Sequence, residues 1–103
     1  MKETDPSRMT VGASNQAGRR KLNNIPDHIA FNTYPGWYGG GPDTMKGNLN
    51  GYIRDYGGKM GIAVSEYGHG ASTGMHENPA KRPSPTGFWH PEEWQSQAHE
   101  TTY

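Results

Sequence analysis

The chain has 103 residues, with ten basic and ten acidic side chains, so its formal net charge is zero. It has no cysteine, which excludes disulfides, a thiolate nucleophile and a cysteine zinc site, and its balanced charge argues against a nucleic-acid binder. Only ten residues are Leu, Ile, Val or Phe, so the chain has little material for a core of its own.

Three short apolar runs predict strands. They span residues 9–14, 28–34 and 61–65, and each is followed by a polar or glycine-rich turn. None alternates between polar and apolar residues, which is typical of strands covered on both faces in a parallel sheet. No run is long enough to cross a membrane, and the polar N-terminus lacks the apolar stretch of a signal peptide. The compartment of the protein stays undefined.

Two helices are predicted between and after these strands. Residues 45–56 carry an apolar stripe at helical spacing, with Asp43 or Thr44 as a cap and glycines at 57–58 to end the helix. A second helix is predicted after Trp89, where Pro91 and two glutamates suit the first turn. Strand, helix and strand at this spacing form a βαβ unit with parallel strands. Two further stretches, residues 19–21 and 68–89, are expected to be loops.

The carboxyl ends of parallel strands are where α/β proteins place their sites. Glu66 directly follows the third predicted strand, where a carboxylate is either a solvated strand end or an active-site group. Tyr34 ends the second strand, and if the two strands are neighbours its phenol is expected to donate a hydrogen bond to Glu66. The rings of Trp37 and Tyr38 follow closely, and such rings either stack on sugar faces or pack beneath a loop.

The five histidines do not show a metal-binding spacing. His69 and His76 are seven residues apart and His90 and His99 are nine apart, and neither spacing matches a compact zinc motif. The three glycines at 39–41 lack the Lys-Ser/Thr pair of a phosphate-binding loop. We therefore expect neither a metal ion nor another cofactor.

Longer motifs resemble glycoside hydrolase family 2. Residues 27–38, which contain Asn-x-Tyr-x-Gly-Trp-Tyr, resemble the sixth strand of the family's barrel, and residues 62–72, which contain Ser-Glu-Tyr-Gly, resemble its seventh strand. Residues 5–14 are similar to the lead-in to strand five, and residues 89–100 to the segment after the long loop in the β-galactosidase branch. The motifs occur in the family's order over nearly the whole chain, and this combination is specific.

The resemblance implies an α/β fold, namely a partial (β/α)8 TIM barrel of about three parallel strands with connecting helices and long loops. Residues 1–103 would then be a fragment of a glycosidase barrel domain that holds strands five to seven. Retaining enzymes of this kind use a nucleophile and an acid/base carboxyl about 5–5.5 Å apart. By resemblance Glu66 is the nucleophile, Tyr34 orients it, and Asn32, Trp37 and His69 contact the sugar.

One part of this chemistry has no counterpart in the sequence. In the family the acid/base Glu lies near the end of strand four, in an Asn-Glu motif. The only carboxylates upstream of the first predicted strand are Glu3 and Asp5, and neither follows an apolar strand. We therefore expect a piece of a retaining exo-β-glycosidase that cleaves terminal β-D-galactosides, and we expect no hydrolysis by this chain alone. Whether the chain is an enzyme by itself is left open.

Three alternatives remain open at this point. Within the same class the substrate is a β-glucuronide, and outside it the chain is a non-catalytic carbohydrate-binding fragment or an orphan gene fragment. The expected partners are a β-galactoside or related sugar, and either the rest of the parent barrel or a second copy of the chain. The rest of the barrel or a second copy is expected because a three-stranded sheet has open edges. No nucleic acid or membrane is expected as a partner.

Overall fold

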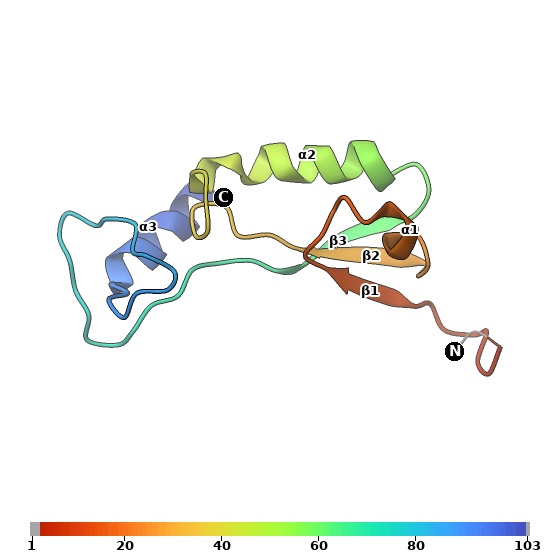
Figure 1. Ribbon diagram of the computed structural model, residues 1–103, viewed down its shortest axis with the longest axis horizontal. Coiled ribbons are helices and arrows are strands. Elements are labelled where there is room, and N and C mark those ends of the chain that lie inside the picture. The colour runs from red at the N-terminus through yellow and green to blue at the C-terminus, as the bar shows by residue number, and fades with distance from the viewer. Residues whose placement is uncertain (1–2, 103) are drawn as a thin grey trace. The chain divides into compact units, whose positions relative to one another are not determined.

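The computed structural model describes residues 3–102. In chain order its elements are β1 (Val11–Ser14), α1 (Arg20–Asn23), β2 (His28–Asn32), the 3-10 helix η1 (Pro42–Thr44), α2 (Met45–Tyr56), β3 (Gly61–Glu66) and α3 (Glu92–Thr102) (Figure 1). The described chain divides into two compact units. The first comprises residues 3–32 and 50–65, and the second comprises residues 33–49 and 66–102.

The first unit is built on a sheet of three parallel strands in the order β1-β2-β3. β1 and β2 are paired in register, with Val11 opposite His28 and Ser14 opposite Phe31. Helix α2 connects β2 to β3, as a βαβ unit requires. The predicted α/β class and the three parallel strands are therefore confirmed.

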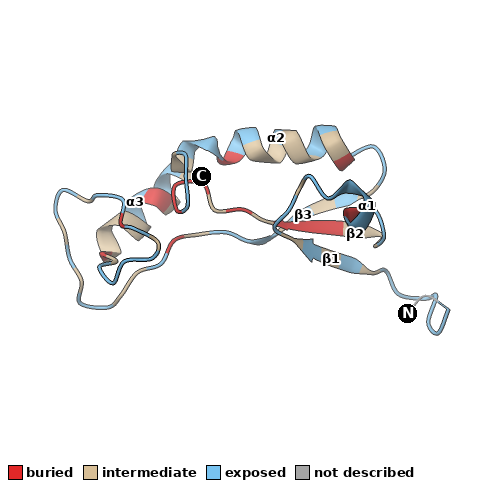
Figure 2. Cartoon of the chain, in the orientation of Figure 1, coloured by how far each residue is buried: buried red, intermediate tan, exposed pale blue. Residues whose placement is uncertain are grey.

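The core of the first unit lies between β2 and α2. Ile29 and Phe31 of β2 pack with Tyr56 of α2, and all three side chains are almost completely buried. The Phe31 ring also stacks on Tyr52, with ring centroids 4.2 Å apart. Burying a side chain of this size stabilises the fold by about 1.5–3 kcal/mol. Figure 2 shows this burial: β2, in the middle of the sheet, is buried, whereas β1 is largely exposed.

A short helix that the sequence did not predict is fastened to this core. Residues 19–21 were expected to lie in a loop, but Arg20–Asn23 form the helical turn α1. Buried Asn23 donates from Nδ2 to the Gln16 carbonyl at 2.9 Å and to the Tyr56 hydroxyl at 3.1 Å. The Tyr56 hydroxyl in turn donates to the Ala17 carbonyl. These contacts between residues far apart in sequence explain why a local pattern did not reveal the turn.

The strand ends differ slightly from the predicted ones. β1 begins at Val11 instead of residue 9, because the amide of Thr10 donates to the Asp27 side chain at 2.8 Å. β2 ends at Asn32 instead of residue 34, three residues before Pro35, which has no amide hydrogen for a ladder. β3 runs one residue further than predicted, to Glu66, whereas α2 has the predicted bounds.

The second unit contains η1, the start of α2, the last residue of β3, the long loop after β3, and α3. Helix α3 packs against η1, and its Ala98 is completely buried. The long loop before α3 is closed by two backbone hydrogen bonds. The Ser72 amide donates to the His90 carbonyl and the Glu92 amide donates to the Met75 carbonyl, each at 2.9 Å. The loop therefore has a defined path although it contains no helix or strand.

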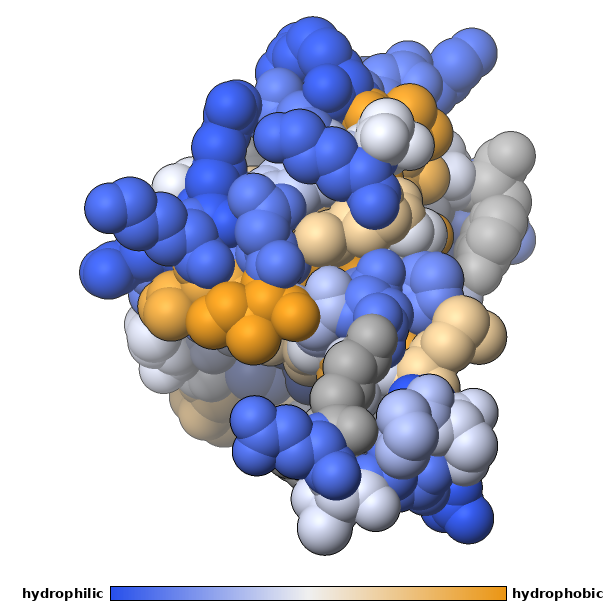
Figure 3. Space-filling view, turned by 90° about the vertical axis from the view of Figure 1, so that its right-hand side faces the viewer, coloured by the Kyte–Doolittle hydropathy of each residue, from blue (hydrophilic) through white to orange (hydrophobic). Residues whose placement is uncertain are grey.

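Several large apolar side chains lie on the surface of the first unit. Val11 is 64% exposed and Ile25 is 75% exposed, and the others are Met9, Leu22 and Ile53. Figure 3 shows hydrophobic patches of this kind between strongly hydrophilic side chains. The small aliphatic content seen in the sequence is thus only partly used in the core.

Candidate active site

Glu66 and Tyr34 meet in the second unit. Glu66 is the last residue of β3 and its side chain is exposed. The Tyr34 hydroxyl donates a hydrogen bond to Oε2 of Glu66, and the Thr33 amide donates to the Glu66 carbonyl at 2.8 Å. The contact expected for neighbouring strands is therefore present. It fixes one oxygen of the carboxylate and leaves the other free to act on a ligand.

Aromatic rings surround the turn that follows Tyr34. The Tyr34 and Tyr38 rings meet edge to face at 5.5 Å, and Trp37 approaches Tyr38 at 6.4 Å. Trp37 is buried, whereas Tyr38 is 72% exposed. Gly36 has a φ of 83°, which favours glycine, and a Cβ there would lie 2.9 Å from the Pro42 nitrogen. The glycine therefore allows the tight turn that presents these rings.

His69 lies inside the packing of the second unit. Its ring is in contact with the rings of Trp37, Trp94 and His99, at centroid distances of 6.1, 6.3 and 5.9 Å. Nε2 lies 3.0 Å from the Pro35 carbonyl oxygen, which only accepts, so this nitrogen carries the proton. Burial lowers the pKa of His69, and the nearby His99 acts in the same direction. His69 is therefore a neutral, buried ring at neutral pH.

Two buried polar atoms near these rings have no hydrogen-bond partner among residues 3–102. They are Nδ1 of His69 and Nε1 of Trp94. An unpaired buried polar group costs about 1–3 kcal/mol, so the second unit holds unused hydrogen-bonding capacity next to the candidate site.

Asn32, the remaining predicted sugar contact, belongs to the first unit. It ends β2, and its Oδ1 accepts a hydrogen bond from the Ser65 hydroxyl at 2.6 Å. The structure thus brings Tyr34, Trp37, Glu66 and His69 into one unit. The hydrogen bond between Asn32 and Ser65 lies within the first unit.

Gln95 is a residue of the second unit that the sequence analysis missed. Its Nε2 donates to the His69 carbonyl at 2.7 Å. It therefore ties α3 to the segment that leaves Glu66. A glutamine on a polar helix carries no local sign of such a contact, which depends on the path of the loop.

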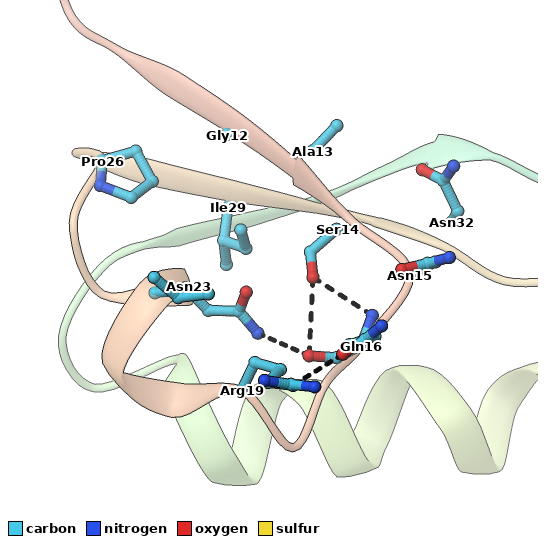
Figure 4. Close-up of a pocket in the computed structure, with 11 residues that line it drawn as sticks. Gly12, Ala13, Ser14, Asn15, Gln16, Arg19, Asn23, Pro26, Ile29 and Asn32 are labelled. Carbon is cyan, nitrogen blue, oxygen red and sulfur yellow. Dashed lines mark hydrogen bonds between the residues drawn. The ribbon is translucent and has the colours of Figure 1, made fainter.

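A hollow in the first unit offers different chemistry. It has a volume of about 590 Å³ and lies beside β1 and α1 (Figure 4). Arg19 donates from Nε to Oε1 of Gln16 at 2.7 Å, and the Gln16 amide donates to the Ser14 hydroxyl at 3.1 Å. None of the residues that line it is an Asp or Glu. Because no carboxylate lines it, this hollow is a weaker candidate for glycosidic chemistry than Glu66.

Two further features of residues 3–102 bear on function. No group of three or more histidines and carboxylates is placed to hold a metal ion. No helix in this part of the chain has the length and apolar character needed to cross a membrane.

Comparisons with known proteins identify the relatives of this chain. A β-glucuronidase of Bacteroides fragilis is 44% identical over 98 residues, which cover 95% of this chain. Bacteroides uniformis β-glucuronidase 2, solved with cyclophellitol-6-carboxylate aziridine covalently bound, matches 97% of the chain at a TM-score of 0.78 and 29% identity. The resemblance to glycoside hydrolase family 2 is confirmed. No family model matches the sequence.

The match to this family extends over one stretch of much longer proteins. The chain spans 14% of the length of the Bacteroides fragilis β-glucuronidase and 12% of the Bacteroides uniformis enzyme. A third protein, assigned as a β-galactosidase of Bacteroides fragilis, matches at a TM-score of 0.81 and 25% identity, and the chain spans 15% of it. The chain therefore corresponds to one stretch of these longer β-glycosidases.

Proposed function

We propose that the chain supplies the nucleophile of a retaining β-glycosidase, and that this nucleophile is Glu66. The observation that carries the proposal is the hydrogen bond from Tyr34 to Oε2 of Glu66 at the carboxyl end of β3. It is supported by the 44% identity to a β-glucuronidase. In a retaining enzyme such a carboxylate must be oriented toward one carbon atom, and a phenol that holds one oxygen provides that orientation.

The proposed reaction has two steps. A carboxylate oxygen of Glu66 attacks the anomeric carbon while the glycosidic bond breaks, and an acid gives a proton to the departing oxygen. Water then attacks the glycosyl ester, deprotonated by the same group acting as base, and releases the sugar and the Glu66 carboxylate. We propose that the acid/base carboxyl comes from the part of a larger enzyme that this chain does not cover. On this proposal the chain forms strands five to seven of a (β/α)8 barrel.

The sugar is proposed to bind over the aromatic turn after Tyr34. Exposed Tyr38 offers a ring surface of the kind that packs against sugar rings, and Trp37, which is buried, is proposed to line the site beside it. Asn32 is proposed as a polar contact from the end of β2. His69 was expected to contact the sugar, and its burial against Trp37 favours support of that ring from behind.

The substrate class is proposed to be a β-glucuronide. The relative with 44% identity is a β-glucuronidase, and this supports a glucuronide more strongly than the motif resemblance of residues 89–100 supports a galactoside. A β-galactoside is the second candidate, since one matching structure is assigned as a β-galactosidase.

A chimera tests this proposal. The matching 98-residue stretch of the Bacteroides fragilis β-glucuronidase is replaced by this chain, and aryl β-glucuronide and aryl β-galactoside are compared as substrates. We expect turnover of the glucuronide, and a loss of roughly 10⁴-fold or more for Glu66→Gln, as when a covalent nucleophile is removed. Glu3→Gln is the control and is expected to leave the rate unchanged.

Two outcomes of these assays contradict the proposal. Full activity of the Glu66→Gln chimera excludes Glu66 as the nucleophile. Turnover by the 103-residue chain alone, abolished by Glu66→Gln, excludes an acid/base group supplied from elsewhere.

A further inference from the structure

Helix α3 holds the long loop before it through two glutamate side chains. Oε1 of Glu92 accepts a hydrogen bond from the Gly74 amide at 2.8 Å. Glu93 makes two contacts, since its Oε1 lies 2.8 Å from Nδ1 of His76 and its Oε2 accepts from the Glu77 amide at 3.0 Å. We call the contacts of Glu93 with His76 and Glu77 the Glu93 bridge.

The loop that the bridge holds also packs on Trp37. The ring of His90, at the far end of the loop, lies 5.2 Å from the Trp37 ring. At the near end, a Cβ on Gly70 would lie 3.1 Å from the same ring. All of these residues belong to the second unit. Both ends of the loop therefore rest on Trp37, and the Glu93 bridge fixes the part between them.

The bridge contains a group that titrates near neutral pH. A neutral His76 can donate from Nδ1 only as one of two tautomers, whereas a protonated ring donates from both nitrogens and also attracts the carboxylate. The charged groups around His76 are Glu92 and Glu93 from α3, with Glu100 lining the same hollow. Glu77, its neighbour in the loop, accepts the Lys81 amide through its own carboxylate. The carboxylates of α3 thus favour a proton on His76.

We infer that Glu93 is a positioning residue, which fastens the loop of residues 70–91 to α3 most firmly while His76 is protonated. The bridge itself is independent of the proposed function. The bridge also bears on the sugar, because the loop that packs on Trp37 is held more firmly at lower pH. This second consequence rests on the proposed function.

The direction of the pH effect follows from the two partners. The hydrogen bond to Glu93 raises the pKa of His76 above its ordinary value of 6.5, and the charge of Glu93 adds to this. Hydrogen bonds from backbone amides, that of Glu77 first, lower the pKa of Glu93, and His76 adds to this. The stabilisation from His76 is complete below pH 6.5 and is lost as the pH rises through its raised pKa. The stabilisation from Glu93 is lost as the pH falls through its lowered pKa.

Nuclear magnetic resonance of the 103-residue chain tests the bridge without any need for activity. The titration of the His76 ring is recorded in native buffer and in concentrated urea. We expect the native midpoint to be higher, Glu93→Gln to remove the increase, and the control Glu100→Gln to preserve it. Equal midpoints in buffer and urea, or an increase that survives Glu93→Gln, would overturn the inference.

Hydrogen exchange at the Glu77 amide is a second measurement. After correction for the intrinsic effect of pH, protection is expected to fall by about two- to fivefold as His76 loses its proton, the range of an exposed ion pair. In His76→Gln, which keeps a donor but does not titrate, protection is expected to be independent of pH. The same fall in both proteins contradicts the inference. Failure of the chimera leaves these readouts unaffected, so the two proposals fail separately.

Discussion

The Tyr34 hydroxyl and the Glu66 carboxylate meet because Glu66 ends β3, Tyr34 lies just beyond the end of β2, and the two strands are neighbours. Strand order places the residues side by side, and the length of the tyrosine side chain closes the remaining distance. The hydrogen bond between Tyr34 and Glu66 is therefore explained by the βαβ connection alone. A phenol is well suited to this position because it donates a single hydrogen bond and carries no charge at neutral pH.

Acid sensitivity is expected at His69. Burial and the nearby His99 lower the pKa of the folded ring below its ordinary value of 6.5. The unfolded state therefore takes up a proton at a higher pH than the folded state, and the stability from His69 is lost as the pH falls below 6.5. Ring titration by nuclear magnetic resonance should give a lower midpoint in buffer than in urea. A midpoint equal to or above that in urea contradicts the described burial.

The chemistry of single residues was more predictable than their burial. The Tyr34–Glu66 contact could be predicted because it depends on strand order alone. The surroundings of His69 could not, because they arise from the loop and α3, which reach it from distant parts of the sequence. The contacts of Gln95 and of the Glu93 bridge could not be predicted either, because their partners lie 16 residues or more away in sequence.

At the scale of elements, helix α2 illustrates how a local pattern can be sufficient. Its apolar stripe and the glycines after Tyr56 predicted bounds that match the observed Met45–Tyr56. Helix α1 illustrates the opposite, because its single turn depends on Asn23 reaching the Tyr56 hydroxyl. Short elements are stabilised mainly by tertiary contacts, and these are not visible in a run of four residues.

Two glycine substitutions test the account of α2. Gly47 is exposed, and nothing lies within 4 Å of a Cβ placed there. Gly47→Ala is therefore expected to stabilise the helix by about 1 kcal/mol. Gly57→Ala is the contrasting variant, because its Cβ would lie 2.6 Å from the Ile53 carbonyl oxygen. Urea unfolding followed by far-ultraviolet circular dichroism should show opposite shifts of the midpoint, and equal shifts would contradict this account.

At the scale of the whole molecule, the described chain leaves strand edges and large apolar side chains uncovered. The described sheet has β1 and β3 as open edges, and Val11 and Ala13 of β1 are exposed. Open edges and bare apolar side chains favour pairing with another chain. The low aliphatic content noted at the outset agrees with this, since the chain matches only 12–15% of the lengths of its relatives.

Self-association is therefore expected of the chain in isolation. Sedimentation velocity at several concentrations should show dimers or larger species. Replacing Val11 by Lys on the edge strand is expected to reduce association, because charges on edges oppose pairing. A chain that stays monomeric at every concentration contradicts this expectation.

Covalent labelling of Glu66 tests the central claim most directly. The chimera described above is treated with cyclophellitol-6-carboxylate aziridine, the compound bound covalently in the Bacteroides uniformis enzyme, and the digested protein is sequenced by mass spectrometry. A nucleophilic carboxylate forms a C–O bond to the cyclitol ring while the aziridine C–N bond breaks and the nitrogen takes up a proton, so the inhibitor stays bound as an ester. We predict one adduct, on Glu66, and none in the Glu66→Gln chimera. An adduct on another carboxylate, or one that persists in Glu66→Gln, would contradict the account.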